Sequence, residues 1–131
     1  MKKIILDTNF LMIPLQFRVD IFSEFQRICN FNYELYVFDE TVNELKNIMQ
    51  KQPSKHKKAA QFGLKLINLK NIGILKAKGS NTDRVIIDNS DKETIVATQD
   101  RLLRKKLLDK GISVVLLRQK KYLVLIERKA L

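Results

Sequence analysis

The chain of 131 residues has the length of one domain, and its 45% hydrophobic residues suffice for an ordinary core. Only 4 Gly and 2 Pro occur, with no low-complexity run, so the composition excludes a disordered or fibrous protein. The 25 Lys and Arg residues outnumber the 14 Asp and Glu residues and give a net charge of +11. This charge favours a polyanionic partner, above all nucleic acid, although lysine-rich faces also serve solubility.

The sequence also argues against a membrane or secreted protein. No segment approaches the roughly eighteen apolar residues of a membrane span. Lys2 and Lys3 precede an apolar run, but Asp7 and Asn9 interrupt it before it reaches the length of a signal sequence. The single cysteine, Cys29, has no intramolecular disulfide partner. We therefore expect a cytoplasmic protein that contacts no membrane.

The first expected element is a short strand at 4–6. Its three apolar residues predict burial on both faces, and it ends at an acid and two small polar residues, Asp7, Thr8 and Asn9. A carboxylate thereby lies at the carboxyl end of a strand, the edge at which ligands bind open α/β sheets. Alternatively, these residues only cap the next helix.

Helix and strand patterns alternate along the rest of the chain. Apolar residues at intervals of three and four indicate helices, and short β-branched or aromatic runs indicate strands. In chain order the expected elements are a turn at 11–14, a helix at 19–29, a strand at 33–38, a helix at 42–49, a helix from Pro53 or Ser54 to 70, a strand at 72–76, a helix from 83, a strand at 93–98, a helix at 101–109 and a strand at 113–117.

Individual residues predict the ends and buried faces of these helices. The expected caps are Asp39 or Thr41 for the helix at 42–49, Thr82 or Asn81 for the helix from 83, and Gly111 after the helix at 101–109. The expected apolar faces are Ala59, Phe62, Leu66 and Leu69 in the helix ending at 70, and Leu102, Leu103, Leu107 and Leu108 in the helix at 101–109.

This alternation predicts an α/β fold. Strands separated by helices form a mostly parallel sheet with right-handed crossovers, covered on both faces. We expect a three-layer α/β/α domain over 1–131 with a central five-stranded sheet. The segment 118–131, which contains the apolar run 122–126, is expected to be a C-terminal edge strand or a docked extension.

Four acids are predicted to meet at one edge of this sheet. Asp7 and Asp100 follow strands, Asp83 opens a helix, and Glu44 lies about one turn into another helix. Two such charges about 4 Å apart repel by ~4 kcal/mol at an effective dielectric near 20, so a cation is expected among them. Hard oxygen ligands favour Mg²⁺ or Mn²⁺, whereas one His and one Cys cannot build a zinc site.

Such a site beside a basic surface favours metal-assisted phosphodiester hydrolysis. Divalent ions activate water and stabilise the leaving oxygen, so no covalent nucleophile is needed. The lone histidine, His56, stands in a lysine-rich helix start and is interpreted as a solvated residue rather than a catalytic base. The scattered glycines form no phosphate-binding loop.

At these motifs the chain resembles the PIN-domain ribonucleases. The resemblance rests on four blocks in order, namely Leu6-Asp7-Thr8-Asn9, Val42-Asn43-Glu44-Leu45, Asp83 at a helix start, and Val96-Ala97-Thr98-Gln99-Asp100 with Leu103 after it. It spans nearly the whole chain. The ending 114–123 is most similar to archaeal relatives of the small-subunit ribosome-processing PIN nucleases, with VapC-type toxins next.

The resemblance implies a Mg²⁺ or Mn²⁺ dependent endoribonuclease acting on single-stranded RNA, with a ribosomal precursor as the expected substrate. Asp7, Asp83 and Asp100 would be the metal-binding acids, and Glu44 would complete the site. Thr8, Asn9 and Thr98 match positions that orient the acids by hydrogen bonding. Gln99 departs from the Asn of many members, which should affect turn geometry more than metal binding. Asp39, Asp88 and Asp91 match no motif position and are interpreted as cap or surface acids.

The sequence indicates the substrate and partner contacts less directly than it indicates the acids. Basic residues near the acids are candidates for phosphate binding, although each also fits a solvated helix face. The candidates are Arg84, Arg101, Arg104, Lys105, Lys106, Lys57 and Lys58. PIN domains commonly self-associate, and the apolar run 122–126 is a candidate homodimer surface.

The sequence was also compared with three other possible functions, a scaffold, a toxin and a receiver-like domain. A ribosome-assembly scaffold with an inactive site would have no reason to keep four mutually repelling acids. A toxin held inactive by an antitoxin is compatible with the sequence, and a neighbouring antitoxin gene would favour it. A phosphorylated receiver-like domain is disfavoured, because its acids would gather beside one middle strand.

Overall fold

The computed structural model describes residues 1–51, 54–79 and 81–127. Pro53 and residues 128–131, which belong to two of the predictions above, lie outside the described residues. The strands are β1 Lys2–Leu6, β2 Tyr33–Phe38, β3 Gly73–Leu75, β4 Thr94–Ala97, β5 Ser113–Arg118 and β6 Tyr122–Ile126. The helices are α1 Thr8–Leu11, α2 Ile13–Phe17, α3 Ile21–Ile28, α4 Asp39–Lys51, α5 Ser54–Leu69, α6 Thr82–Asp88 and α7 Arg101–Asp109.

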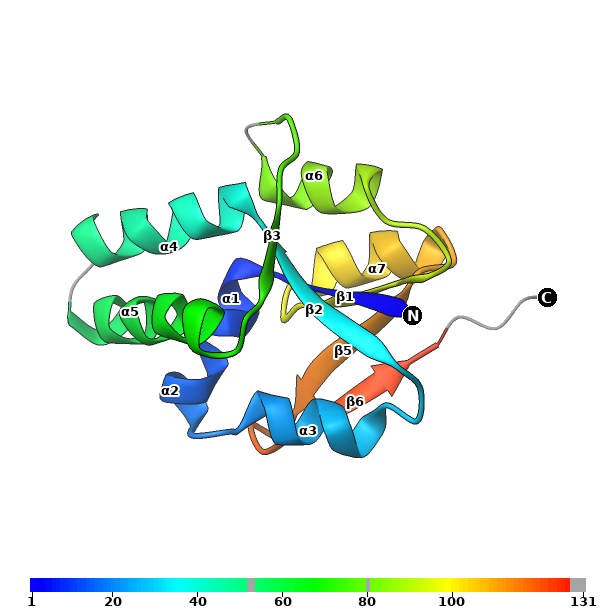
Figure 1. Ribbon diagram of the computed structural model, residues 1–131, viewed down its shortest axis with the longest axis horizontal. Helices are drawn as coiled ribbons and strands as arrows, with labels where there is room; N and C mark the ends of the chain where they lie inside the picture. The colour runs from blue at the N-terminus through cyan, green and yellow to red at the C-terminus, as the bar shows by residue number, and fades with distance from the viewer. Residues whose placement is uncertain (52–53, 80, 128–131) are drawn as a thin grey trace.

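These strands form one sheet in the order β3-β2-β1-β4-β5-β6 (Figure 1). Every neighbouring pair is parallel except β5 and β6, which are antiparallel. The expected mixed α/β fold is therefore confirmed, but the expected number of strands is wrong, because the sheet has six strands rather than five. The parallel strands bring the carboxyl ends of β1 and β4 to the same edge, where α1 and α7 begin.

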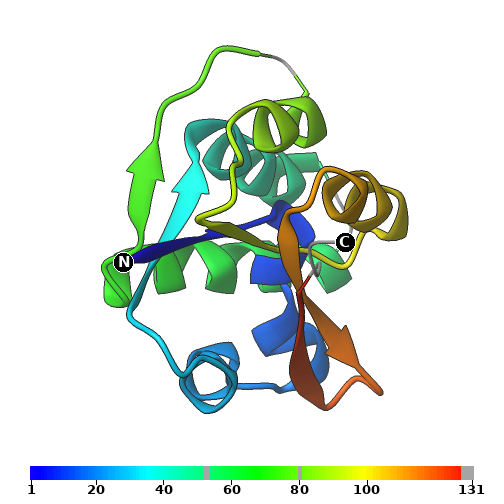
Figure 2. The same cartoon turned by 90° about the vertical axis from the view of Figure 1, so that its right-hand side faces the viewer.

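The sixth strand arises from a chain reversal without a glycine. Gln119 and Lys120 both adopt positive φ values, 54° and 57°, and the Lys121 amide donates to the carbonyl of Arg118. Such turns usually contain Gly or Asn, so the sequence offers no hairpin signal here. Figure 2 shows the resulting pair of β5 in orange and β6 in red.

The core lies in two layers, one on each face of the sheet. Alternate side chains of a strand point to opposite faces. Ile5, Val96 and Val114 pack against α6 and α7, whereas Ile4 and Ile95 belong to the cluster formed with α1 to α5. The protein is thus built of helices on both sides of the sheet (Figures 1 and 2).

The buried face of α5 differs from the prediction. Ala59 and Leu66 are buried as expected, but Phe62 and Leu69 are 37% and 72% exposed, and the face turned to the core includes Ala60, Gly63 and Ile67. The cause is a close approach between helices. A Cβ atom added at Gly63 would lie 2.9 Å from the backbone oxygen of Leu11, so only a small face of α5 fits there.

Three smaller predictions are also corrected. The segment at 11–14 is not a simple turn, because α1 and α2 surround Met12 and Pro14 stands in the first turn of α2. The helix expected at 42–49 begins earlier, at Asp39. Leu102 is 72% exposed and does not belong to the buried face of α7.

The outer edge of β6 is bonded to α3. The Leu123 amide donates to Glu24 Oε1 at 2.9 Å, and Arg27 Nη2 donates to the Leu123 carbonyl at 2.8 Å. Arg27 and Glu24 also pair with each other at 2.8 Å. Both backbone groups of Leu123 that face away from β5 are therefore occupied by side chains.

Within the described ranges, no helix is both long and apolar enough to cross a membrane.

Candidate active site

Asp7 is the most enclosed acid at the carboxyl edge of the sheet. It follows β1 directly, caps α1 and is only 5% exposed. Both carboxylate oxygens have donors. The Thr8 amide donates to Oδ1 at 2.8 Å, and the Thr98 hydroxyl donates to Oδ2 at 2.7 Å. The side chain is thereby held in one orientation by residues from two neighbouring strand ends.

The surroundings of Asp7 raise its pKa. Burial is the largest cause, because it disfavours the charged form, and the hydrogen bonds from Thr98 and Thr8 oppose it. The charges of Asp83 and Asp100 raise the pKa further. These interactions show that acids from β1, α6 and the start of α7 act on one another.

Glu44 reaches the same edge from α4. Its Oε1 accepts hydrogen bonds from the Thr8 hydroxyl at 3.3 Å and from the Thr82 hydroxyl. Burial raises the pKa of Glu44 most, and the charge of Asp7 raises it further. Glu44 therefore connects α4 with the first turns of α1 and α6.

Asp83 and Asp100 lie at two helix starts. Asn81 caps α6 by accepting from the Arg84 amide, which places Asp83 in the first turn. Asp100 caps α7, where its Oδ1 accepts from the Leu102 amide at 2.9 Å. Burial and then the Asp100 carboxylate raise the pKa of Asp83, whereas the positive charge of Lys106 lowers it.

Hydrogen bonds connect the segment after β1, which contains Asp7, with the segment after β4, which contains Asp100. The Gln99 amide donates to Asn9 Oδ1 at 3.3 Å, and the Gln99 side chain donates to the Asn9 carbonyl at 3.4 Å. The Asp100 amide donates to the Thr98 hydroxyl at 3.1 Å. Thr98 thus forms hydrogen bonds with the Asp7 carboxylate and the Asp100 amide.

Two of the four acids, Glu44 and Asp83, border an open cavity of about 340 Å³ between α4 and α6. Figure 1 shows the first turns of these helices facing each other, and the bond from Thr82 to Glu44 joins them. The lining residues are Glu40, Glu44, Asn81, Thr82 and Asp83.

The donor chemistry of this edge fits a hard divalent cation. Carboxylates and hydroxyls supply only oxygen atoms. Burial is the main cause of the raised pKa values of Asp7, Glu44 and Asp83, and the negative charges of neighbouring acids raise these pKa values further. As the side chains stand, no group of three or more His, Cys, Asp or Glu residues among those described is close enough to hold a metal ion. Binding would thus require the carboxylates to draw together.

The predicted phosphate-binding residues fall in three places. Arg101, Arg104 and Lys105 lie on α7 directly after Asp100. Arg84 follows Asp83, is largely exposed and pairs with Asp88 at 3.5 Å. Lys57 and Lys58 are exposed on the first turns of α5, near the end of α4 that is remote from Glu44.

Two residues of this edge were not among the predicted site residues. Thr82 bonds to Glu44, and Glu40 raises the pKa of Glu44. Glu40 stands four residues before Glu44 on α4, a helical spacing that the sequence does contain. The role of Thr82 depends on how α4 and α6 pack and leaves no local signal. Lys106, a candidate for phosphate binding, lowers the pKa of Asp83.

A mostly parallel sheet with acids at its carboxyl edge defines the class of protein, a three-layer α/β domain with a candidate hydrolytic site. Residues 4–120 match the family described as "PIN like domain", and the chain belongs to that family. It is 30% identical over 124 residues to Ribonuclease VapC4 of Methanocaldococcus jannaschii, across 93% of this chain and 95% of the relative.

A solved structure supports the same fold. The structure of the PIN domain endonuclease Utp24 superposes with a TM-score of 0.76 and covers 95% of this chain and 91% of the Utp24 chain. The two sequences are 20% identical, so this likeness concerns the arrangement of the elements. The expected PIN-domain family is therefore confirmed.

Proposed function

We propose that this protein is a divalent-metal-dependent endoribonuclease that hydrolyses phosphodiester bonds of single-stranded RNA. The observation that carries the proposal is the meeting of Asp7, Glu44, Asp83 and Asp100 at one edge, where neighbouring acids contribute to the raised pKa values of Asp7, Glu44 and Asp83. Membership of the PIN-like family and similarity to a relative named as a ribonuclease support it. The net charge of +11 suits a polyanionic substrate.

The four carboxylates would hold Mg²⁺ or Mn²⁺. When bound, such a cation supplies activation of water and stabilisation of charge at the phosphate. The chain itself supplies orientation. Thr98 and the Thr8 amide fix both oxygens of Asp7, and the Thr8 and Thr82 hydroxyls fix Oε1 of Glu44. Lys106 partly neutralises Asp83.

RNA phosphates would be bound by the basic residues around this edge. Arg84, Arg101, Arg104 and Lys105 follow the acids directly in α6 and α7. Lys57 and Lys58 would extend the path along α5. Such contacts bind the backbone without reading base sequence.

The test is cleavage of a labelled single-stranded RNA by wild type and Asp7→Asn in Mn²⁺, Mg²⁺ or EDTA. The wild type should cut with either metal and not in EDTA, and Asp7→Asn should lose activity while it stays folded. Asp91→Asn is the matched control, because Asp91 is exposed before β4 and matches no motif position. Full activity of Asp7→Asn would refute the site assignment.

Within this function we propose ribosomal RNA processing, on the basis of the similarity of the C-terminal sequence noted above. A toxin-type ribonuclease with an antitoxin partner is the second candidate, and the similarity to Ribonuclease VapC4 favours it. Production of wild type and Asp7→Asn in the native cells distinguishes them. Processing predicts precursor ribosomal RNA that accumulates with Asp7→Asn, whereas a toxin predicts growth arrest with wild type alone.

A further inference from the structure

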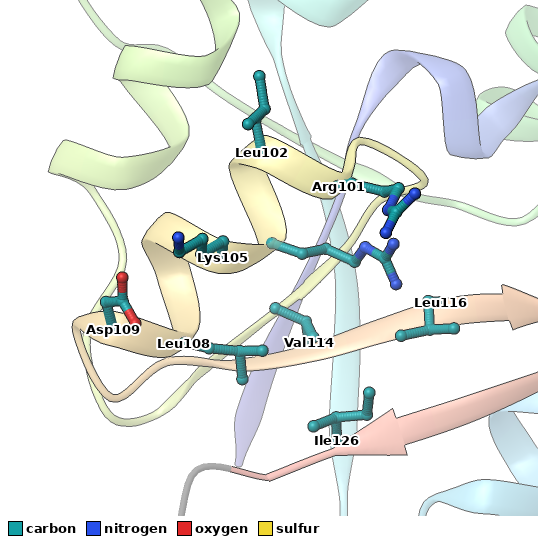
Figure 3. Close-up of a pocket in the computed structure, with 9 residues that line it drawn as sticks. Arg101, Leu102, Lys105, Leu108, Asp109, Val114, Leu116 and Ile126 are labelled. Atoms are coloured by element: carbon teal, nitrogen blue, oxygen red, sulfur yellow. The ribbon is translucent and has the colours of Figure 1, made fainter.

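The largest of the cavities described lies outside the acidic edge, between α7 and the hairpin of β5 and β6. Its volume is about 660 Å³, within the roughly 300–1,000 Å³ typical of small-ligand sites. Figure 3 shows Arg101 at the start of α7, Asp109 at the other end of the helix, and Leu116 and Ile126 on the two strands. The lining is completed by Leu102, Arg104, Lys105, Leu108 and Val114.

Two arginines of α7 line this cavity, and a third arginine lies near them. Arg101 and Arg104 line it, and their charges, together with that of Arg118, are close enough to interact. Arg118 ends β5 at the carboxyl edge, on the same face as Val114 and Leu116 because side chains alternate along a strand. The arginine cluster is defined as Arg101, Arg104 and Arg118, and two of its members line the cavity.

No member of this cluster forms an ion pair within the described part of the chain. The two ion pairs among the described residues, Arg27 with Glu24 and Arg84 with Asp88, involve none of its members. The buried Nε of Arg104 has no hydrogen-bond partner in the described part of the chain. Burial and the neighbouring arginines lower the pKa of Arg104, and Asp100 opposes them. An anion at this position would relieve the repulsion.

We propose that this cavity binds one nucleotide of single-stranded RNA that flanks the cleaved bond. Its phosphate would lie on the arginine cluster, and its ribose and base would lie over Leu116 and Ile126. Planar guanidinium groups suit phosphate oxygens, and apolar surfaces suit the faces of bases. Asp100 caps the helix whose next residue is Arg101, so a strand bound at the acids reaches the cavity directly. The proposal rests on the ribonuclease function above.

The test is RNA binding in EDTA, where cleavage does not interfere. The probe is a fluorescein-labelled oligouridylate of about ten nucleotides, compared with an abasic oligoribonucleotide of the same length. The variants are Arg101→Gln and Arg104→Gln. Lys92→Gln is the matched control, because it removes the same charge from an exposed turn at the amino end of β4. Arg101 is exposed, so its substitution should not disturb folding.

Each arginine variant should bind more weakly, and the slope of log Kd against log salt should fall by about 0.7 relative to Lys92→Gln. The abasic probe should bind wild type more weakly than oligouridylate does. Equal slopes in all variants would overturn the proposal. Equal binding of the two probes would show that the cavity contacts the phosphate but not the base, and it would overturn the assignment of a nucleotide site. Displacement of RNA by polyglutamate of equal charge would instead assign the cavity to an acidic protein.

The outcomes separate this inference from the proposed function. If wild type cleaves RNA but the arginine variants bind it normally, the inference fails and the nuclease stands. If the arginine variants lose binding but wild type cuts no RNA with either metal, the cavity stands and the nuclease fails.

Discussion

Thr98 lies at the junction of the two acids that follow strands. Its hydroxyl donates to Asp7 Oδ2 and accepts from the Asp100 amide, so one buried group fixes the orientation of both residues. A hydroxyl that does both cannot be replaced by an apolar group of the same shape without leaving a carboxylate oxygen and an amide unpaired. Thr98 is therefore a positioning residue for the proposed reaction.

We predict that Thr98→Val lowers kcat by roughly tenfold to a hundredfold, the usual effect of removing an orienting partner, with little change in KM. Thr98→Ser keeps the hydroxyl and should restore most of the activity. The measurement is single-turnover cleavage of labelled RNA, with unfolding midpoints to follow stability. A loss of stability in Thr98→Val without any loss of kcat would reduce Thr98 to a structural role.

At this scale, local sequence rules place the acids at one edge of the sheet but do not identify their hydrogen-bond partners. Asp7, Asp83 and Asp100 are placed by local rules, because each stands at the end of a strand or the start of a helix. Asn81 as a cap is likewise local. The bond from Thr82 to Glu44 joins residues from two helices. No pattern within either segment encodes how those helices pack.

At the scale of elements, predictions succeeded where the chain contains explicit end signals. Helix α7 runs over the predicted 101–109, with Asp100 as its N-cap and Gly111 at a φ of 81° after its end. The hairpin before β6 lacks such a signal, since Gln119 and Lys120 are unusual in the left-handed region. The hydrophobic pattern did not predict that Gly63 lies on the buried face of α5. A glycine is required there because the backbone of Leu11 approaches the helix closely.

The contact of α3 with β6 is an element-scale feature with a pH dependence. Glu24 accepts from both Arg27 and the Leu123 amide. The hydrogen bond with Arg27 is the main cause of the lowered pKa of Glu24, and the Leu123 amide adds to it. A second chain that paired with the β6 edge would have to displace both side chains from Leu123.

We predict that Glu24→Gln lowers the free energy of unfolding by about 1 kcal/mol near neutral pH. Because the pKa of Glu24 is lower in the folded state, its contribution is present above the unfolded pKa and is lost as pH falls through the folded pKa. The deficit of the variant relative to wild type should therefore shrink on acidification below about pH 4. Denaturant unfolding across this range measures it, with the exposed Glu93→Gln as control. A deficit independent of pH would show that the Glu24 charge does not stabilise this contact.

On the scale of the whole molecule, charge is distributed unevenly. The chain carries +11 overall, yet Asp7, Glu44 and Asp83 share one edge at which their negative charges repel. Folding places these acids together against that repulsion, so the metal-free protein is destabilised at its own site. A cation that binds the folded state alone would remove this cost and stabilise the fold.

We predict that Mn²⁺ or Mg²⁺ raises the unfolding midpoint of wild type and leaves Asp7→Asn unchanged. At ~100 times its Kd, a ligand stabilises the folded state by about 2.7 kcal/mol, a shift of several degrees for a domain of this size. In EDTA the order should reverse, with Asp7→Asn unfolding at a higher temperature than wild type, because the substitution removes a buried charge that Asp83 and Asp100 repel. Asp91→Asn should follow wild type in every condition. Equal responses of wild type and Asp7→Asn to Mn²⁺ would show that the metal binds elsewhere. The hydrolysis proposed for this edge of the sheet would then be refuted.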